Sequence, residues 1–243
     1  MDLTIERPPE YHCTARPELV QHVPENARAV LDLGCGDGSN LALLFEHREN
    51  LGMKLPFCYG IDSKVDDVAS RRLWGPAIHL YKDDLWDMVC RKASTKEYGG
   101  HWWDCIIMGD ILEHMPYPVP FLQMWADGLS SYGTLVMSVP NMGWIRVVDK
   151  IMNQSFSYAT AGHFDADHKR FFCKEDIRKL VEHCGLTIEK LQPLSTDVDV
   201  YGHKPHTPLK YNDWTIEDPS ADLIEQLSCY QWLCVAKKGD SNG

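Results

Sequence analysis

Residues 30–39 read VLDLGCGDGS, an apolar run that leads into a glycine-rich turn and then into a segment with helical character. Gly34, Gly36 and Gly38 let the backbone turn tightly and let a ligand lie against it, because a Cβ would obstruct the approach. The helix that follows presents free N–H groups. The spacing is G-x-G-x-G, and Ser39 stands where the dinucleotide motif G-x-G-x-x-G has its third glycine. This departure counts against a nicotinamide dinucleotide at the turn.

Short apolar runs alternate with helix-length segments along the chain, a pattern that predicts an α/β fold with a largely parallel sheet. We expect strands at 29–33, 57–61, 77–81, 103–108, 134–139, 186–191 and 230–236. We expect helices at 39–47, 65–73, 84–93, 119–129 and 174–184, the last ended by Gly185. No crossover helix follows the strand at 230–236, so we predict that it is an antiparallel edge strand.

The chain of 243 residues fits one domain, residues 1–243, with insertions. Residues 192–228 contain four prolines and form a longer loop than compact domains usually hold. We expect this segment, together with residues 143–172, to cover the substrate side of a site at the carboxyl ends of the strands.

Composition limits the partners and the compartment. The net charge is −11 and no Lys/Arg cluster stands out, which counts against nucleic acid and anionic membranes. No apolar run approaches the roughly 18 residues of a membrane span. The nine cysteines are scattered without a C-x-x-C pair, so we expect free thiols in a reducing, cytoplasmic setting.

With Asp32 two residues before its first glycine, the turn resembles motif I of class I S-adenosylmethionine (SAM)-dependent methyltransferases. The resemblance implies a Rossmann-like seven-stranded methyltransferase sheet with helices on both faces and a cap insertion. It also implies SAM as cofactor. The residues it assigns to the cofactor are Arg16, Asp32, Gly34, Cys35, Gly36, Gly38, Asp62, Asp84, Leu85, Gly109 and Asp110.

Several of these assignments have specific expected contacts. Asp62 ends the second strand, where an acid can accept hydrogen bonds from both ribose hydroxyls, although strand-end acids also serve as turn residues. In the family, the acid after the third strand takes the adenine amino group. Asp84 is our choice, Asp83 competes with it, and helix N-capping is the alternative for either. Arg16 could pair with the SAM carboxylate as a bidentate fork, or could be a surface arginine.

Residues 112–114, 133–141 and 168–172 resemble a small-molecule branch of the family often found near sugar and natural-product pathways. The likeness extends over roughly residues 11–191. We therefore predict transfer to a hydroxyl oxygen of a small metabolite or sugar-containing natural product. N-methylation of a small amine or peptide, methylation of a macromolecule, and a non-catalytic SAM-binding partner protein are the alternatives.

Methyl transfer to a hydroxyl requires a base, and histidine titrates near neutrality. We expect the base among His114, His163 and His168. The alternative for His114 is that it merely caps a helix end, and the alternative for His168 is that it is packed beside Phe171. The residues that we expect to contact the acceptor are Asp110, His114, Trp144, His163 and Asp165. Asp165 could also orient an imidazole, and Trp144 could instead belong to the floor of a cap. The cluster at 163–168 shows no trusted metal pattern, so no metal is predicted.

Overall fold

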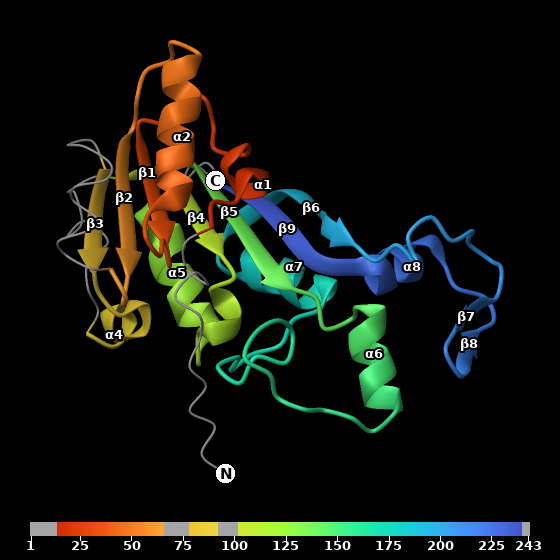
Figure 1. Ribbon diagram of the computed structural model, residues 1–243. Coiled ribbons are helices and arrows are strands. Elements are labelled where there is room, and N and C mark those ends of the chain that lie inside the picture. Colours follow the sequence, from red (N-terminus) through yellow and green to blue (C-terminus); the bar gives the residue numbers. More distant parts are fainter. Residues whose placement is uncertain (1–13, 66–77, 92–101, 240–243) are drawn as a thin grey trace.

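The computed structural model describes residues 14–65, 78–91 and 102–239. These residues form a seven-stranded sheet in the order β3-β2-β1-β4-β5-β9-β6 (Figure 1). Its strands are β1 (Ala29–Leu33), β2 (Phe57–Asp62), β3 (Ile78–Lys82), β4 (Trp103–Gly109), β5 (Leu129–Pro140), β6 (Leu186–Thr196) and β9 (Cys229–Lys238). The seven predicted strands are confirmed, and β5 and β6 are several residues longer than predicted.

The position of β9 in the sheet differs from the prediction. This strand pairs antiparallel with both β5 and β6, so its direction was predicted correctly. It is not an edge strand, however, because β6 lies outside it. The reason is burial: residues 231–236 of β9 are all buried, whereas β6 exposes charged side chains such as Glu189 and Lys190. A strand with charged positions suits the edge.

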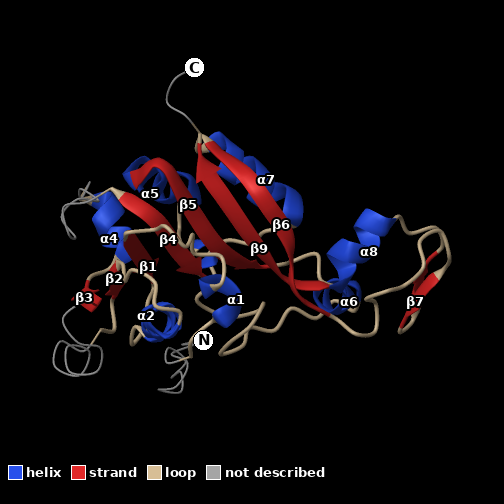
Figure 2. Cartoon of the chain, turned by 90° about the horizontal axis from the view of Figure 1, so that it is seen from above, coloured by secondary structure: helices blue, strands red, loops and turns tan. Residues whose placement is uncertain are grey.

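Helices cover both faces of the sheet (Figure 2). On one face, Leu31 and Leu33 of β1 belong to a core with α4 (Leu85–Cys90), α5 (Pro118–Gly128) and α7 (Lys174–His183). On the other face, Val30 packs in a core with α1 (Pro17–Val20) and α2 (Ser39–Asn50). The alternation along β1 is that of a strand buried on both sides, which is why its sequence is almost wholly apolar.

A third, smaller core lies beside the sheet and not on it. Its buried residues come from α6 (Ile145–Met152), α8 (Ala221–Ser228), the hairpin of β7 (Leu209–Tyr211) and β8 (Trp214–Ile216), and a turn at Val200. The prediction of a long loop at 192–228 is therefore wrong. The elements there are three to eight residues long and separated by prolines, too short to show a clear hydrophobic period.

The predicted helices at 39–47, 119–129 and 174–184 are confirmed as α2, α5 and α7 within a few residues. The predicted helix at 84–93 begins as α4 at Leu85, and the helix at 65–73 lies almost wholly outside the described residues. Helices α6 and α8 were not predicted. In the described part of the chain no helix has the length and apolarity needed to cross a membrane. The eight cysteines among the described residues are all free thiols.

Candidate active site

A cavity of about 990 Å³ lies at the carboxyl ends of the parallel strands. Its walls include residues that directly follow or end β1, β2, β4 and β5, together with the segment 161–169 and the start of β9. Open α/β sheets place their ligands at this edge. The volume is at the upper end of the range for small-molecule sites, so a cofactor and a second small molecule can share it.

The glycine turn forms one wall of the cavity. Gly34, Gly36 and Gly38 have φ values of 71°, 55° and 89°, in the left-handed region that favours glycine. A Cβ on Gly34 would lie 2.1 Å from Cδ1 of Ile111, so the approach of these two segments requires glycine. Gly34 and Cys35 line the cavity, whereas Gly36 and Gly38 shape the turn behind it and start α2.

Asp62 reaches the cavity from the end of β2. Its Oδ2 accepts a hydrogen bond of 3.0 Å from the Gly36 N–H, and its Oδ1 accepts one of 2.8 Å from the Lys64 N–H. These bonds fix the carboxylate between the two turns, and it is 8% exposed. The remaining lone pairs of the two oxygens suit the hydroxyl pair of a ribose, and the ribose contact itself stays a prediction.

Asp83 and Asp84 are separated by the structure. Asp84 lines the cavity with Leu85, and its Oδ1 accepts hydrogen bonds from the N–H groups of Trp86 and Asp87 at 2.9 and 2.8 Å. It therefore caps α4, the alternative considered for it, and it also faces the cavity. Asp83 is absent from the cavity wall and pairs with Arg91.

Arg16 and Asp110 form the centre of a polar network in the cavity wall. Nη1 of Arg16 donates to Asp110 Oδ2 at 2.7 Å and to Ser138 Oγ at 3.1 Å, Nη2 donates to Gln231 Oε1 at 2.9 Å, and Nε donates to Glu18 at 2.8 Å. Burial lowers the pKa of Arg16, but the carboxylates of Asp110 and Glu18 raise it further, so the net shift is upward.

The same network holds Asp110 in an unusual backbone conformation. Its φ is 58°, and its Oδ1 accepts hydrogen bonds from Ser138 Oγ at 2.8 Å and from the Gln231 side-chain amide. Four of the five N–H donors of Arg16 are used, which leaves one Nη2 hydrogen without a partner among the described residues. A full bidentate fork onto a SAM carboxylate would require the network to open.

Asp32 lies behind the cavity wall. It is 1% exposed on β1 and accepts a hydrogen bond of 3.1 Å from Nδ2 of Asn40. The Asn40 side chain in turn accepts the Arg16 N–H at 2.7 Å and lines the cavity. The placement of Asp32 thus connects it to the cavity through Asn40.

The three predicted histidines are brought together around one part of the cavity wall. His163 is 4% exposed, and burial lowers its pKa to about 4. Its imidazole is therefore neutral at pH 7, and Nε2 donates to the Tyr230 carbonyl at 2.9 Å. A group with this pKa is a weak base, which favours a positioning role for His163 over proton removal.

His114 and His168 lie edge to face, with ring centroids 4.9 Å apart. Nδ1 of His114 lies 3.3 Å from the Asp167 carbonyl oxygen, and Nδ1 of His168 lies 3.3 Å from the His163 carbonyl oxygen. A carbonyl only accepts, so each Nδ1 must carry the proton. Each Nε2 then keeps its lone pair when the ring is neutral, as a base or a ligand requires.

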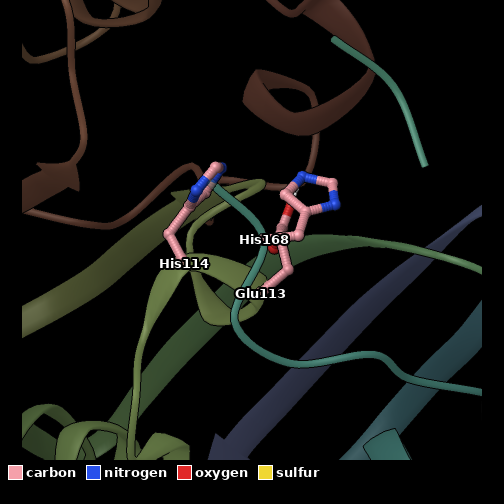
Figure 3. Close-up of side chains that lie close together, drawn as sticks. All are labelled: Glu113, His114 and His168. Carbon is pink, nitrogen blue, oxygen red and sulfur yellow. Dashed lines mark ion pairs between the residues drawn. The ribbon is translucent and has the colours of Figure 1, made fainter. Parts of the chain in front are cut away.

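Glu113 lies beside these two imidazoles in the cavity wall (Figure 3). Its side chain is 1% exposed, and neither carboxylate oxygen has a hydrogen-bond partner among the described residues. Burial, and then the nearby charge of Asp110, raises the pKa of Glu113 well above its ordinary range. Glu113 was not among the predicted site residues, because its burial depends on the segment around His168.

Comparison with known proteins agrees with this geometry. Residues 7–191 match the family model described as a methyltransferase domain. The chain belongs to this family. It is a SAM-dependent methyltransferase with the strand order and Rossmann-like α/β fold of class I, and SAM is its methyl donor.

Solved structures resemble the methyltransferase in fold. A SAM-dependent methyltransferase from Archaeoglobus fulgidus has a TM-score of 0.54 at 17% identity, over 88% of this chain and 87% of that one. An O-methyltransferase family protein from Burkholderia thailandensis has a TM-score of 0.57 at 14% identity, over 93% and 55%. The 1,6-didemethyltoxoflavin N1-methyltransferase of the same organism has a TM-score of 0.55 at 15% identity, over 93% and 78%. The likeness thus covers proteins named for both oxygen and nitrogen methylation.

Two predicted acceptor residues of the methyltransferase stand back from the cavity. Trp144 packs on His163 with ring centroids 5.0 Å apart and donates its Nε1–H to Asp197 at 3.1 Å. Asp165 is buried and accepts the Asp167 N–H at 2.9 Å. Neither is part of the cavity wall. Of the two predicted covering segments, 143–172 contributes to that wall through residues 161–169, and 192–228 contributes no residue to it.

Proposed function

We propose that this methyltransferase transfers the methyl group of SAM to a hydroxyl oxygen of a small metabolite or sugar-containing natural product in the cytoplasm. The observation that carries the proposal is the pair His114 and His168, which line the same cavity as the residues assigned to the cofactor and which both place Nδ1 at a backbone carbonyl oxygen. The net charge of −11 supports a small acceptor over a nucleic acid.

The residues of the cavity fit SAM. Gly34 and Cys35 bring the turn after β1 to the cavity wall, and Asp62 offers fixed carboxylate oxygens for a ribose. Asp84 and the backbone of Leu85 are assigned to the adenine, and Gly109 and Asp110 to the methionine end, where Arg16 offers its remaining N–H.

Bound SAM supplies a methyl group on a sulfonium sulfur, a leaving group that needs no proton. The protein therefore has to position the acceptor and take up one proton. Alignment of two reactants can contribute on the order of 7–11 kcal/mol. His114 or His168 accepts the hydroxyl proton at Nε2, and His163, neutral and bonded to the Tyr230 carbonyl, fixes the segment that carries His168.

N-methylation of an amine is the second candidate function. The cavity wall carries the carboxylates of Glu18, Asp62, Asp110 and Asp167, which would attract an ammonium group. The same histidines would then remove the ammonium proton. A protein that binds SAM without transfer is the third candidate, and only an assay of methyl transfer separates it from the others.

The first test is calorimetric titration with SAM and S-adenosylhomocysteine, repeated on Asp62→Ala and on the control Asp83→Ala. We expect saturable binding that weakens at least tenfold in Asp62→Ala and less than twofold in Asp83→Ala, whose carboxylate lies outside the cavity wall. Equal affinity in all three proteins would contradict the cofactor assignment.

The second test measures S-adenosylhomocysteine release with phenols, catechols, sugars and sugar alcohols, against matched primary amines. We expect turnover with a hydroxylated compound. Turnover with amines only would favour nitrogen methylation. Binding of SAM without turnover on either panel would count against a small-molecule methyltransferase.

A further inference from the structure

We propose that Glu113, His114 and His168 bind a divalent first-row transition-metal ion, and that this ion coordinates the acceptor hydroxyl. The role of the ion in catalysis rests on the proposed function. The site itself is inferred from the geometry of the three side chains (Figure 3). Glu113 and His114 belong to the short 3₁₀ helix η3 (Leu112–His114) that follows β4, and His168 comes from the segment after α6. Two distant parts of the chain thus supply the three ligands.

The distances suit a shared ion. One ligand atom from each side chain lies within 4.8 Å of the other two, and His168 Nε2 is 4.0 Å from Glu113 Oε1. Metal–ligand bonds of about 2.1 Å place two ligand atoms up to about 4.2 Å apart. The three side chains therefore need to move inward by less than about 1 Å, which rotation about their χ angles can supply.

The burial of Glu113 is the observation that points independently to a ligand. Both of its carboxylate oxygens are buried without a hydrogen-bond partner among the described residues. A buried carboxylate without partners is costly, and native proteins rarely tolerate one unless an ion or a proton compensates. A cation held between Glu113 and the two imidazoles would supply that compensation.

The imidazoles are oriented as metal ligands usually are. A ligating histidine commonly donates its other ring N–H to a carbonyl or carboxylate, which fixes the ring and its tautomer. His114 and His168 both place Nδ1 at a backbone carbonyl oxygen, 3.3 Å away in each case. Nε2 is then the atom of each ring that would bind the ion.

The ligand set indicates the class of ion. Two imidazoles and one carboxylate suit Mn²⁺, Fe²⁺, Co²⁺ or Zn²⁺, whereas Mg²⁺ and Ca²⁺ prefer oxygen ligands. Asp110 stays outside the set because Arg16, Ser138 and Gln231 hold its oxygens. His163 also stays outside the set, since its Nε2 donates to the Tyr230 carbonyl.

Three protein ligands leave coordination positions open towards the cavity. An acceptor hydroxyl in one of them would have a lowered pKa and would lose its proton to water. The oxygen lone pair then forms the bond to the methyl carbon, and the electron pair of the broken C–S bond stays on sulfur. The ion thus replaces the histidines as the group that activates the acceptor, and it favours oxygen acceptors over amines.

The test is titration of tag-free, EDTA-treated protein with MnCl2 and with ZnCl2, followed by calorimetry and, for Mn²⁺, by electron paramagnetic resonance. We expect one saturable site per chain. Glu113→Gln and His168→Gln should each weaken it at least tenfold, while the control His206→Gln, an exposed histidine paired with Asp218, should leave it unchanged. SAM affinity within twofold of the unaltered protein shows that each variant is folded.

Binding weaker than millimolar, or equal binding in all variants, would overturn the proposed site. Activity separates this inference from the proposed function. If EDTA lowers methyl transfer at least tenfold and Mn²⁺ or Zn²⁺ restores it, methyl transfer and the ion both stand, and the histidines act as ligands and not as bases. If methyl transfer proceeds unchanged in EDTA, the ion is overturned and the histidines act as bases. If SAM binds but no acceptor is methylated, the proposed function fails, and the metal titration alone decides whether the ion binds.

Discussion

Asp32 shows how strongly burial acts on one residue of this protein. It is 1% exposed in β1, an interior strand of the sheet, and burial, together with the charge of Asp62, raises its pKa to about 7 although Asn40 donates to it. In the unfolded chain an aspartate titrates near 4. Between these values the folded protein keeps a proton that the unfolded chain has lost.

The stability of the protein should therefore fall as pH rises from about 4 to about 7, by roughly 2–4 kcal/mol through Asp32 alone. Asp32→Asn removes this dependence. We expect the variant to exceed the unaltered protein in unfolding free energy at pH 8 and to differ from it by less than about 1 kcal/mol at pH 4. Urea unfolding at four pH values measures the difference, with the exposed Asp213→Asn as control. A difference independent of pH would contradict the assignment.

Asp84 combines two functions that substitution can separate. Its Oδ1 caps α4, and the residue also lines the cavity. Asp84→Ala should cost about 1 kcal/mol of stability and weaken SAM binding, whereas Asp84→Asn keeps a good N-cap and loses only the charge. We expect both variants to lose at least fivefold in SAM affinity, measured by calorimetry, and only the alanine to lose stability. Unchanged affinity in Asp84→Asn would leave the carboxylate as a cap alone.

At the scale of elements, the turn after β1 requires glycine at position 34 for two reasons. Gly34 has a positive φ, and the side chain of Ile111 occupies the space that a Cβ would need. Gly52 offers a matched comparison, because its φ of 63° is similar and a Cβ there would meet no atom within 4 Å. The difference between the two positions isolates the steric demand.

Gly52→Ala should cost about 1 kcal/mol, the backbone term alone. Gly34→Ala should cost about 1–3 kcal/mol more, because its Cβ overlaps Cδ1 of Ile111. Ile111→Val removes that methyl group, so the double variant with Gly34→Ala should recover part of the loss. Urea unfolding of the unaltered protein, Gly34→Ala, Ile111→Val and the double variant gives the coupling free energy between the two positions. Equal costs at Gly34 and Gly52 would show that the turn relaxes away from Ile111.

The elements that sequence predicts well are those with a strong local cause. The strands are apolar runs because both faces of the sheet are covered, and the turn after β1 is visible because only glycine suits it. The strand order within the sheet is less accessible: β9 was placed at the edge, and its position between β5 and β6 follows from burial that only the assembled sheet creates. Helix α6 and the hairpin were missed because they pack on each other rather than on the sheet.

The candidate site divides in the same way. Asp62 and Asp84 were predictable because they directly follow strands whose carboxyl ends meet at one edge. The contribution of Gln231 was not, since it lies 121 residues from the Asp110 that it contacts. Glu113 and Trp144 depend likewise on segments far away in the sequence, which bury the first beside His168 and turn the second towards Asp197.

At the scale of the whole molecule, the two cores of the sheet are distinct from the third core around α6 and α8. Asp197 connects the elements of that third core. Its carboxylate is 1% exposed and accepts hydrogen bonds from Arg146 Nε at 2.7 Å and Trp144 Nε1 at 3.1 Å. Burial raises the pKa of Asp197, but the bonds from Arg146 and from the Asp199 N–H lower it further, so the net shift is downward.

A lowered pKa means that the charge of Asp197 stabilises the folded protein above about pH 4 and ceases to do so as pH falls through the folded value. Asp197→Ala should therefore cost about 1–3 kcal/mol near pH 7, because it leaves three donors (Arg146 Nε, Trp144 Nε1 and the Asp199 N–H) without their acceptor. Since Trp144 also packs on His163, the loss should reach the cavity wall as well.

Hydrogen–deuterium exchange at pH 7 locates the effect. We expect faster exchange in α6 and α8 of Asp197→Ala, and unchanged exchange in β1 and β4. Asp199→Ala is the matched control, because Asp199 also pairs with Arg146, at 3.4 Å, but its side chain is 58% exposed and should contribute little. Faster exchange throughout the sheet would show instead that the third core and the sheet unfold as one cooperative unit, because α6 opens only with the strands it adjoins.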